Sequence, residues 1–296
     1  MMVPRGLLAS LPWMLLLPVS QASPLIQRRD TATITPTAAA PSTTIVYDWA
    51  AGGTPQFPIH HSCNSTLRNQ LQQALDELVV LAEHARDHIL RWGGESPFVQ
   101  KYFGKNSSTA EPIGWYDRII AADKNGMTFR CDDPDLNCAT QEGYGGHWRG
   151  SNATQETVIC ALSFETRRYL SSMCNLGYTV AASPLNTFWA TDLLHRVLHV
   201  PKIAEMVVEH VAEEYTDVLE LGEGDPAQSA RDIHALQYFA VDVYAYDVAA
   251  PGIGCMGEPA KEEEEVPTTT TTAQPSATSV AAKECHTHDN GDVHCE

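Results

Sequence analysis

The amino-acid sequence predicts a mainly helical α+β domain that is held by disulfides and flanked by disordered tails. Apolar residues recur at helical spacing in long segments, whereas the stretch from 95 to 150 is rich in Gly, Asn, Asp and Pro and leaves room for short strands only. The eight cysteines, an even number, favour disulfides in an exported chain. We expect one domain from 46 to 257, a length that suits a full core.

The N-terminus has the features of a secretory signal peptide over residues 1–22. Arg5 supplies the positive charge, a short apolar run extends from Leu7 to Leu17, and small residues follow. This run is too short to span a bilayer and no later segment is long enough, so we expect no transmembrane anchor. Residues 23–45 are rich in Thr, Ala and Pro, which predicts a disordered leader. Together these segments predict a secreted, extracellular protein that can also associate with the cell surface.

The glycosylation sequons agree with export, and the net charge limits the kinds of partner. Sequons for N-glycosylation begin at Asn64, Asn106 and Asn152, which predicts a glycoprotein. The net charge of -18 repels phosphate groups, which excludes nucleic acid as a main partner. Dispersed carboxylates attract cations weakly and make no tight site by themselves.

The pairing of the cysteines cannot be deduced from their positions. One local alternative is a bond between Cys131 and Cys138, which would close a short acidic loop. The cysteines are Cys63, Cys131, Cys138, Cys160, Cys174, Cys255, Cys285 and Cys295.

Helical periodicity is strongest in 65–92, where two glycines follow and end the helix. His84 and His88 stand four residues apart beside its apolar stripe; such a pair either binds a metal or, as is more common, lies at the edge of a packed face. The stripe consists of Leu67, Leu71, Leu75, Leu78, Ala82, Ala85 and Ile89.

Short strands and three more helices follow in the second half of the domain. The strands are expected at 127–131 and 157–162. The helices are expected at 183–199, where a Ser-Pro pair starts the segment, at 201–221, after a proline that ends or kinks the chain, and at 230–249.

The peptide from His195 to His199 is the strongest candidate for a metal site. Two imidazoles four residues apart lie on one helix face, which is how zinc peptidases present two ligands in a His-Glu-x-x-His segment. Arg196 stands where those enzymes have the glutamate, and arginine cannot accept a proton. Asp192, one turn before His195, could orient a ligand imidazole by accepting its other N–H. Such pairs also arise by chance on many helices.

A zinc site of this kind needs at least one more ligand from the protein. On the expected helix 201–221, our first choice is His210, because imidazole is the commonest partner for two histidines. Glu214 and Asp217 share that helix face and are the alternatives, and Asp247 is a more distant one.

A second group of ligands ends the chain. Residues 258–284 combine an acidic run with Thr, Ser and Pro, which predicts a disordered linker, and Asn290-Gly291 predicts a turn that folds residues 285–296 into a hairpin. Either thiolates bind zinc there, or the two cysteines form a disulfide and the histidines bind; an oxidising exterior favours the disulfide. An inert, disulfide-closed terminus is the third alternative. The candidate ligands are Cys285, His286, His288, His294 and Cys295.

The segment 189–201, the segments 235–240, 244–247 and 251–255, and the Cys/His tail resemble a fungal secreted zincophore family. This family contains pH-regulated antigens and a related major allergen, and the resemblance covers about 49–255 and the tail. It implies a zincin-like, metallopeptidase-type fold, zinc capture under zinc limitation, handover to a cell-surface zinc transporter, and binding of host complement regulators. By the resemblance, His195, His199 and also His210 are the zinc ligands.

The sequence therefore predicts a secreted zinc-binding protein that captures extracellular Zn²⁺ for fungal uptake. One alternative is an active secreted zinc metalloprotease whose base comes from elsewhere, such as Glu209, Glu213 or Glu214. Another is a metal-free surface antigen or adhesion protein. Self-association, as a homo-oligomer, is left open by the sequence.

Overall fold

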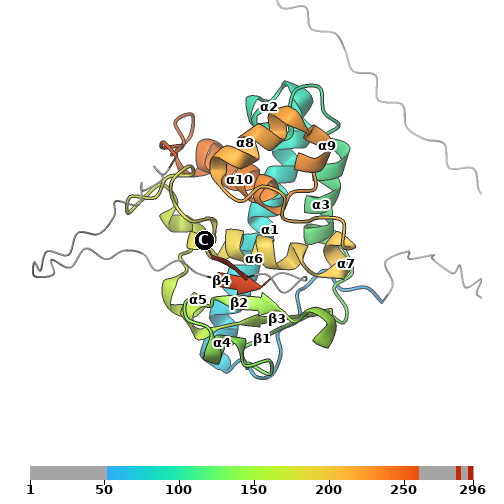
Figure 1. Cartoon of the computed structure of the whole chain (residues 1–296), viewed down its shortest axis with the longest axis vertical. Helices are drawn as coiled ribbons and strands as arrows, with labels where there is room; N and C mark the ends of the chain where they lie inside the picture. Colours follow the sequence, from blue (N-terminus) through green and yellow to red (C-terminus); the bar gives the residue numbers. More distant parts are fainter. Residues whose placement is uncertain (1–51, 260–284, 288–292, 296) are drawn as a thin grey trace, which may run out of the picture. The chain divides into compact units, whose positions relative to one another are not determined.

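The computed structural model describes residues 52–259, 285–287 and 293–295 (Figure 1). The expected signal peptide and leader lie outside these residues, as do residues 260–284 of the expected linker and His288 of the tail. Among the described helices, none is both long and apolar enough to cross a membrane.

Helices make up most of the described domain, and the strands are short. The helices are α1 (Ser65–Trp92), α2 (Pro97–Phe103), α3 (Ala110–Ala121), α4 (Asn137–Thr140), α5 (Ala161–Thr166), α6 (Trp189–Leu198), α7 (Pro201–Ala204), α8 (Tyr215–Gly224), α9 (Pro226–Ser229) and α10 (Ile233–Tyr244). Single turns form at η1 (Gly93–Glu95), η2 (Gly150–Asn152), η3 (Leu170–Ser172), η4 (Leu185–Thr187) and η5 (Ala245–Ala249). The strands are β1 (Thr128–Arg130), β2 (Gly146–Trp148), β3 (Glu156–Ile159), β4 (Cys285–Thr287) and β5 (Val293–Cys295). The predicted mainly helical α+β class is confirmed.

Helix α1 forms where the apolar stripe predicts it. The Oδ1 atom of Asn64 caps its first turn by accepting from the backbone N–H groups of Thr66 and Leu67, each at 3.0 Å. Its last turn ends at Gly93, whose φ of 54° favours glycine. The stripe residues are buried apart from Leu67, which is half-buried against the core. Burial of this stripe places α1 through the centre of the molecule, where α3, α6 and α10 pack against it.

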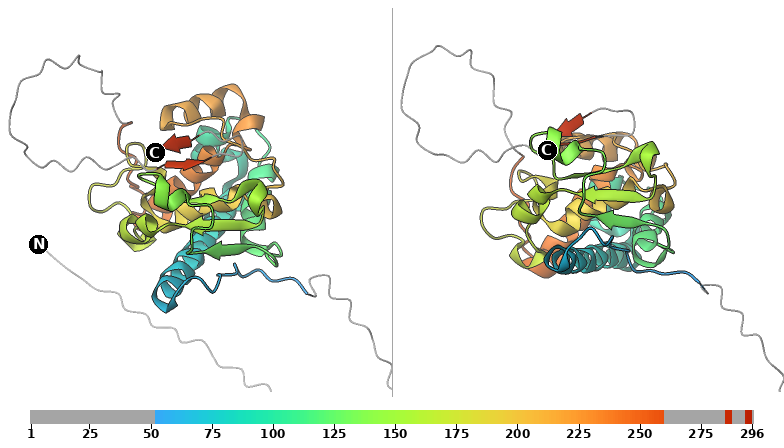
Figure 2. Two further views of the ribbon diagram at one scale, coloured as in Figure 1. Left: turned by 60° about the horizontal axis from the view of Figure 1, so that its bottom comes forward. Right: turned by 90° about the horizontal axis from the view of Figure 1, so that it is seen from below.

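The small sheet has the order β1-β3-β2, with β1 parallel and β2 antiparallel to β3. In Figure 1 the helix α6 lies between this sheet and the helices α8 and α10. The views of Figure 2 show the green strands next to the long blue-green helix α1. Helix α6 is therefore covered on both sides, and all ten of its residues are buried.

Helix α6 starts later than the Ser-Pro pair predicts. Backbone pairing with Arg168 holds Phe188 in an extended conformation. The N–H of Arg168 donates to Thr187 O at 2.9 Å, and its carbonyl accepts from Trp189 N at 2.9 Å. The helix can therefore begin only at Trp189. Its end agrees with the expectation, because Val200 is extended before Pro201.

The predicted helix 201–221 is wrong. Helix α7 stops after one turn, since Glu205 and Met206 adopt left-handed φ values of 55° and 58°. The chain then runs extended, and Glu209 forms backbone hydrogen bonds at 2.9 and 3.0 Å on either side of Asp232. This pairing gives residues 205–214 a loop conformation instead of a helical one.

Within residues 52–259, three disulfides join the six cysteines, namely Cys63–Cys131, Cys138–Cys160 and Cys174–Cys255. The bond between Cys131 and Cys138 that we considered is thus wrong. Cys131 follows β1, which pairs with the segment before α1, so its nearest partner is Cys63. The third bond fastens the end of the domain, where Cys255 O accepts from Val180 N at 2.9 Å and Met256 O accepts from Ala181 N at 2.8 Å.

Candidate metal centre

Three imidazoles meet at the C-terminal end of α6. The Nε2 atom of His199 lies 3.1 Å from Nε2 of His195 and 3.2 Å from Nε2 of His210. One ligand atom from each of the three lies within 4.8 Å of the other two. We call this group the three-His cluster. His195 is buried, whereas His199 and His210 are half-buried, so the cluster opens towards solvent on one side.

Asp232 brings His210 to the helix. Its buried carboxylate accepts from the N–H groups of Val211 at 2.9 Å and Ala212 at 3.1 Å through Oδ1, and caps α10 through Oδ2. Burial raises the pKa of Asp232, although the nearby His234 and these backbone hydrogen bonds act in the opposite direction. The carboxyl group thus fixes the two residues after His210 to the start of α10.

Gln237 of α10 orients the imidazole of His195. Gln237 Nε2 donates to Thr191 O at 3.0 Å, which leaves its Oε1 as an acceptor 3.3 Å from His195 Nδ1. The Nδ1 atom then carries the proton, and the lone pair of Nε2 points into the cluster. This is the role that hydrogen-bond partners of metal-ligating histidines usually have.

The role expected for Asp192 is wrong, because its contacts are to two arginines. Arg196 donates to both carboxylate oxygens, from Nε at 3.0 Å and from Nη2 at 2.9 Å, and Arg167 donates at 3.3 Å. Burial alone would raise the pKa of Asp192, but the charges of Arg167 and Arg196 hold it below its ordinary value. Arg196 also packs against the backbone at Gly146, where a Cβ atom would lie 2.9 Å from Nη1. The arginine of the motif therefore joins α6 to the sheet.

The alternative ligands have other partners. Glu214 and Asp217 form a capping box at the start of α8 and are exposed. Asp247 accepts from His84 at 3.1 Å and from His88 at 2.8 Å. These contacts stabilise helix ends and the edge of α1, and none of the three carboxylates belongs to the three-His cluster.

Sequence reasoning missed His234 as a neighbour of the cluster. Its ring is buried, its Nδ1 donates to Ala212 O at 2.7 Å, and its centroid lies 4.9 Å from that of His210. His210, Glu213 and His234 form a second group of ligand atoms within 4.8 Å of one another. The available signal was that His234 and Gln237 stand three residues apart on one predicted helix.

The described parts of the tail pair as strands β4 and β5. They are antiparallel, with Cys285 opposite Cys295 and His286 opposite His294 along the backbone. The expected turn at Asn290 lies outside the described residues. The sequon residues Asn64, Asn106 and Asn152 are all exposed.

The family whose description reads "HRXXH: Putative peptidase family" matches residues 12–258. The chain belongs to this family. The motif in its name corresponds here to His195 through His199, and the expected resemblance is confirmed.

The chain is 47% identical over 298 residues to Major allergen Asp f 2 of Aspergillus fumigatus, an alignment that covers 93% of this chain and 96% of that protein. It is 50% identical over 212 residues to pH-regulated antigen PRA1 of Candida albicans, covering 72% of this chain and 71% of that protein. A solved zinc peptidase from Grifola frondosa is 14% identical, with a TM-score of 0.44 over 60% of this chain and 96% of that chain. We draw no conclusion from a structural likeness at that level.

Proposed function

We propose that this protein is a secreted zincophore that captures extracellular Zn²⁺ through the three-His cluster for fungal uptake. The observation that carries the proposal is the convergence of three Nε2 atoms at 3.1 and 3.2 Å. Zn–N bonds of about 2.0–2.1 Å in a tetrahedral shell require N···N separations of about 3.3–3.4 Å. Three nitrogens at this spacing suit a zinc ion, and imidazole nitrogen is among the donors that zinc prefers.

Zinc capture fits the site better than peptide cleavage, because an arginine stands where zinc peptidases have their general base. Arg196 is buried and held by Asp192, and it accepts no proton. A general base has to reach the metal-bound water. The half-exposed His199 and His210 instead give an ion a path to the cluster from solvent.

The resemblance to the zincophore family supports the remaining parts of the proposal. Here the signal peptide of residues 1–22 directs export, and the linker 258–284 carries the Cys/His tail of 285–296 as an accessory zinc carrier. Glycans on the three sequons, handover to a cell-surface zinc transporter and binding of host complement regulators are proposed on the same basis. Self-association is compatible with each of these roles.

Zinc stoichiometry at equilibrium tests the proposal. The full mature protein, a chain cut after Ala282, and the variant His195→Ala/His199→Ala are compared. The cut chain should keep one zinc ion, and the variant should lose it. The matched control is His84→Ala/His88→Ala, which removes from α1 two imidazoles that are also four residues apart. This control protein should still bind one zinc ion. Full zinc binding by the cluster variant would exclude the three-His cluster as the site, and a zinc-free parent would support a metal-free surface antigen.

The pH dependence of zinc affinity gives an independent check. Neutral imidazoles bind metal ions, so affinity should fall as the pH drops through about 6.5. Titrations with a competing chelator between pH 7.5 and pH 5 measure this directly. A flat profile would contradict histidine ligation.

The location of Glu213 favours one runner-up, a zinc metalloprotease. Its carboxylate belongs to the group of ligand atoms that contains His210 and His234. A protease using Glu213 as its base would cleave casein in a chelator-sensitive way and lose that activity on Glu213→Gln. The zincophore proposal expects no such cleavage in the parent protein.

A further inference from the structure

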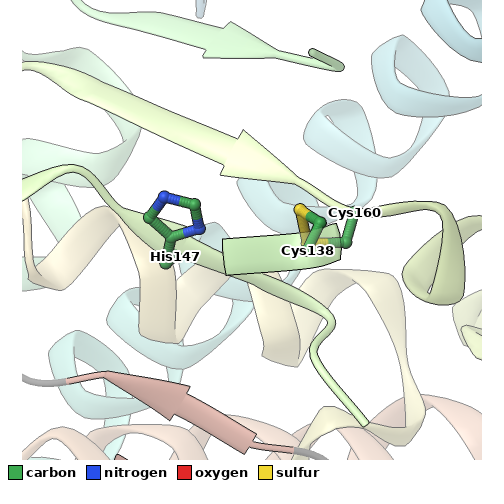
Figure 3. A group of neighbouring side chains, drawn as sticks. All are labelled: Cys138, His147 and Cys160. Carbon is green, nitrogen blue, oxygen red and sulfur yellow. A yellow bond between two sulfur atoms is a disulfide. The ribbon is translucent and has the colours of Figure 1, made fainter. Parts of the chain in front are cut away.

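A second group of metal-suited side chains lies in the sheet, apart from the three-His cluster. Cys138 is in α4, His147 is in β2 and Cys160 directly follows β3. The sulfur atoms and one ring nitrogen lie within 4.8 Å of one another, and the two cysteines form a disulfide (Figure 3). The pairing of β2 with β3 places His147 opposite Val158, so the backbone holds the ring beside the bond.

One ring nitrogen of His147 is a buried atom without a hydrogen-bond partner. Nε2 lies 3.2 Å from Asp135 Oδ2, and this carboxylate also binds Arg149 at 2.7 Å and is therefore ionised. An ionised carboxylate accepts only, so Nε2 carries the proton and Nδ1 keeps its lone pair. The residue is 3% exposed, and Nδ1 has no partner among the described residues. Burial lowers the pKa of His147, which favours the neutral ring.

This is the hydrogen-bonding pattern of a metal ligand. Metal-binding histidines commonly donate their second N–H to a carboxylate, which fixes the tautomer and the ring orientation. Leaving a buried acceptor unsatisfied costs about 1–3 kcal/mol, so such an atom needs an explanation. Asp133 is also close, since its charge acts to raise the pKa of His147, and its Oδ1 is buried with no hydrogen-bond partner in the described part of the chain.

We propose that Cys138, Cys160 and His147 form a second zinc site that opens when their disulfide is reduced. A dithiol reductant transfers two electrons and two protons to the S–S bond, which breaks into two thiols while the reductant forms its own disulfide. Zinc then displaces both thiol protons to solvent and binds two thiolates and the neutral imidazole. The two negative charges balance the dication, which suits a buried place. This site shares no residue with the three-His cluster, so either proposal can fail alone.

The local structure permits both the reduction of the Cys138–Cys160 bond and the separation of the two sulfurs that zinc binding requires. Cys138 is half-buried, and α4 is a single turn at the surface, with exposed residues on the C-terminal side of Cys138. Zn–S bonds of about 2.3 Å require the sulfurs to separate to about 3.8 Å. A small shift of α4 supplies this separation, while Cys160 stays fixed by its N–H bond to Gly145 O at 2.9 Å.

The test measures cobalt binding by the full chain after two histidines of the three-His cluster and both tail cysteines have been replaced. The background variant is His195→Ala/His199→Ala/Cys285→Ser/Cys295→Ser. It is treated with dithiothreitol, freed of the reductant without oxygen, and titrated with Co²⁺. We expect one equivalent with a thiolate-to-cobalt charge-transfer band after reduction, and no such band before it.

Two further variants in this background assign the ligands. Cys138→Ser/Cys160→Ser should lose the band, and His147→Gln should weaken cobalt binding about tenfold or more. The matched control is His88→Gln, which alters another buried imidazole that contacts a carboxylate and should leave the titration unchanged. Near-ultraviolet circular dichroism establishes that each reduced variant remains folded. The proposal is overturned if folded, reduced protein shows no thiolate band, or if His147→Gln binds cobalt as tightly as the background.

Discussion

The helical and sheet regions each bring three metal-suited side chains together, but by different forces. Around the three-His cluster, α6 and α10 are buried among apolar residues, and hydrogen bonds that Gln237 and Asp232 accept complete the arrangement. The sheet region has a small core of its own around Tyr144 and is held by the Cys138–Cys160 bond and by charged pairs. These pairs join Arg130 to Asp132 and Glu156, and Arg149 to Glu156 and Asp135.

The difference determines what each region responds to. Apolar burial depends little on pH or on reductants, so the packing that brings the three-His cluster together should be the same under oxidising and reducing conditions. Charged pairs respond to pH and a disulfide responds to reductants, so the arrangement of Cys138, His147 and Cys160 in the sheet region depends on both conditions. Under the two proposals, the chain would have one metal site that is always formed and one that forms only after reduction.

The largest expected effect comes from Arg196→Glu, which introduces the residue that zinc peptidases have at this position of the motif. The new carboxylate would face buried Asp192 and remove its closest partner. We expect a loss of about 3–5 kcal/mol in the free energy of unfolding, measured with urea, and no gain of peptidase activity. Arg118→Glu, which alters a partly exposed arginine paired with Glu205, should cost far less. Chelator-sensitive cleavage by a stable Arg196→Glu protein would contradict this reading of the motif.

The second-largest expected effect comes from Asp232→Ala. It leaves three backbone N–H groups without their acceptor and frees the loop that carries His210. We expect a loss of about 2–3 kcal/mol in unfolding free energy together with weaker zinc binding. Asp225→Ala removes a cap from the short helix α9 and should cost about 1 kcal/mol while zinc affinity stays constant. Equal zinc affinities in the two variants would show that Asp232 does not position His210.

The third and smallest expected effect is a difference in how acid changes the stability of the two regions. Hydrogen bonds from Arg149 lower the pKa of Asp135 to about 2 from 3.8, so its stabilisation is present above about pH 4 and is lost between pH 4 and pH 2. The expected loss is on the order of 1 kcal/mol because solvent screens the pair. The raised pKa of Asp232 has the opposite sign, since protonation there favours the folded state.

Hydrogen exchange measured from pH 5 to pH 2 checks this difference. Amides of β2 and β3 should lose protection before those of α6 and α10. Arg149→Gln should reduce the pH dependence in the sheet. Simultaneous loss in both regions would mean that the domain unfolds as one unit under these conditions.

Local patterns predicted the parts of the fold that depend on neighbouring residues. The bounds of α1 follow from its stripe and from Gly93, and the end of α6 follows from Pro201. The predicted helix face that carried His210 does not exist, and a loop brings this residue to His199 instead. The reason is backbone pairing between segments around Glu209 and Asp232, which no periodicity reveals.

Contacts between distant segments account for the other differences. The hydrogen-bond partner of His195 Nδ1 is Gln237, which is 42 residues away in the sequence. Residue spacing alone had favoured Asp192, one helical turn before His195. The partner of Cys131 is likewise 68 residues away, before α1. Side-chain pairs of this kind depend on how the helices pack, which residue spacing does not encode.

The bond between Cys174 and Cys255 also has a mechanical consequence. Any tension applied to the chain beyond residue 259 first reaches Cys255, where a covalent bond and two backbone hydrogen bonds tie the strand-like segment to residues 174–181. The disulfide gives force from the tail a covalent path to Cys174, so this force need not pass through α10, the helix that carries Gln237. The tail can be pulled or cut without unravelling the domain to which it is attached.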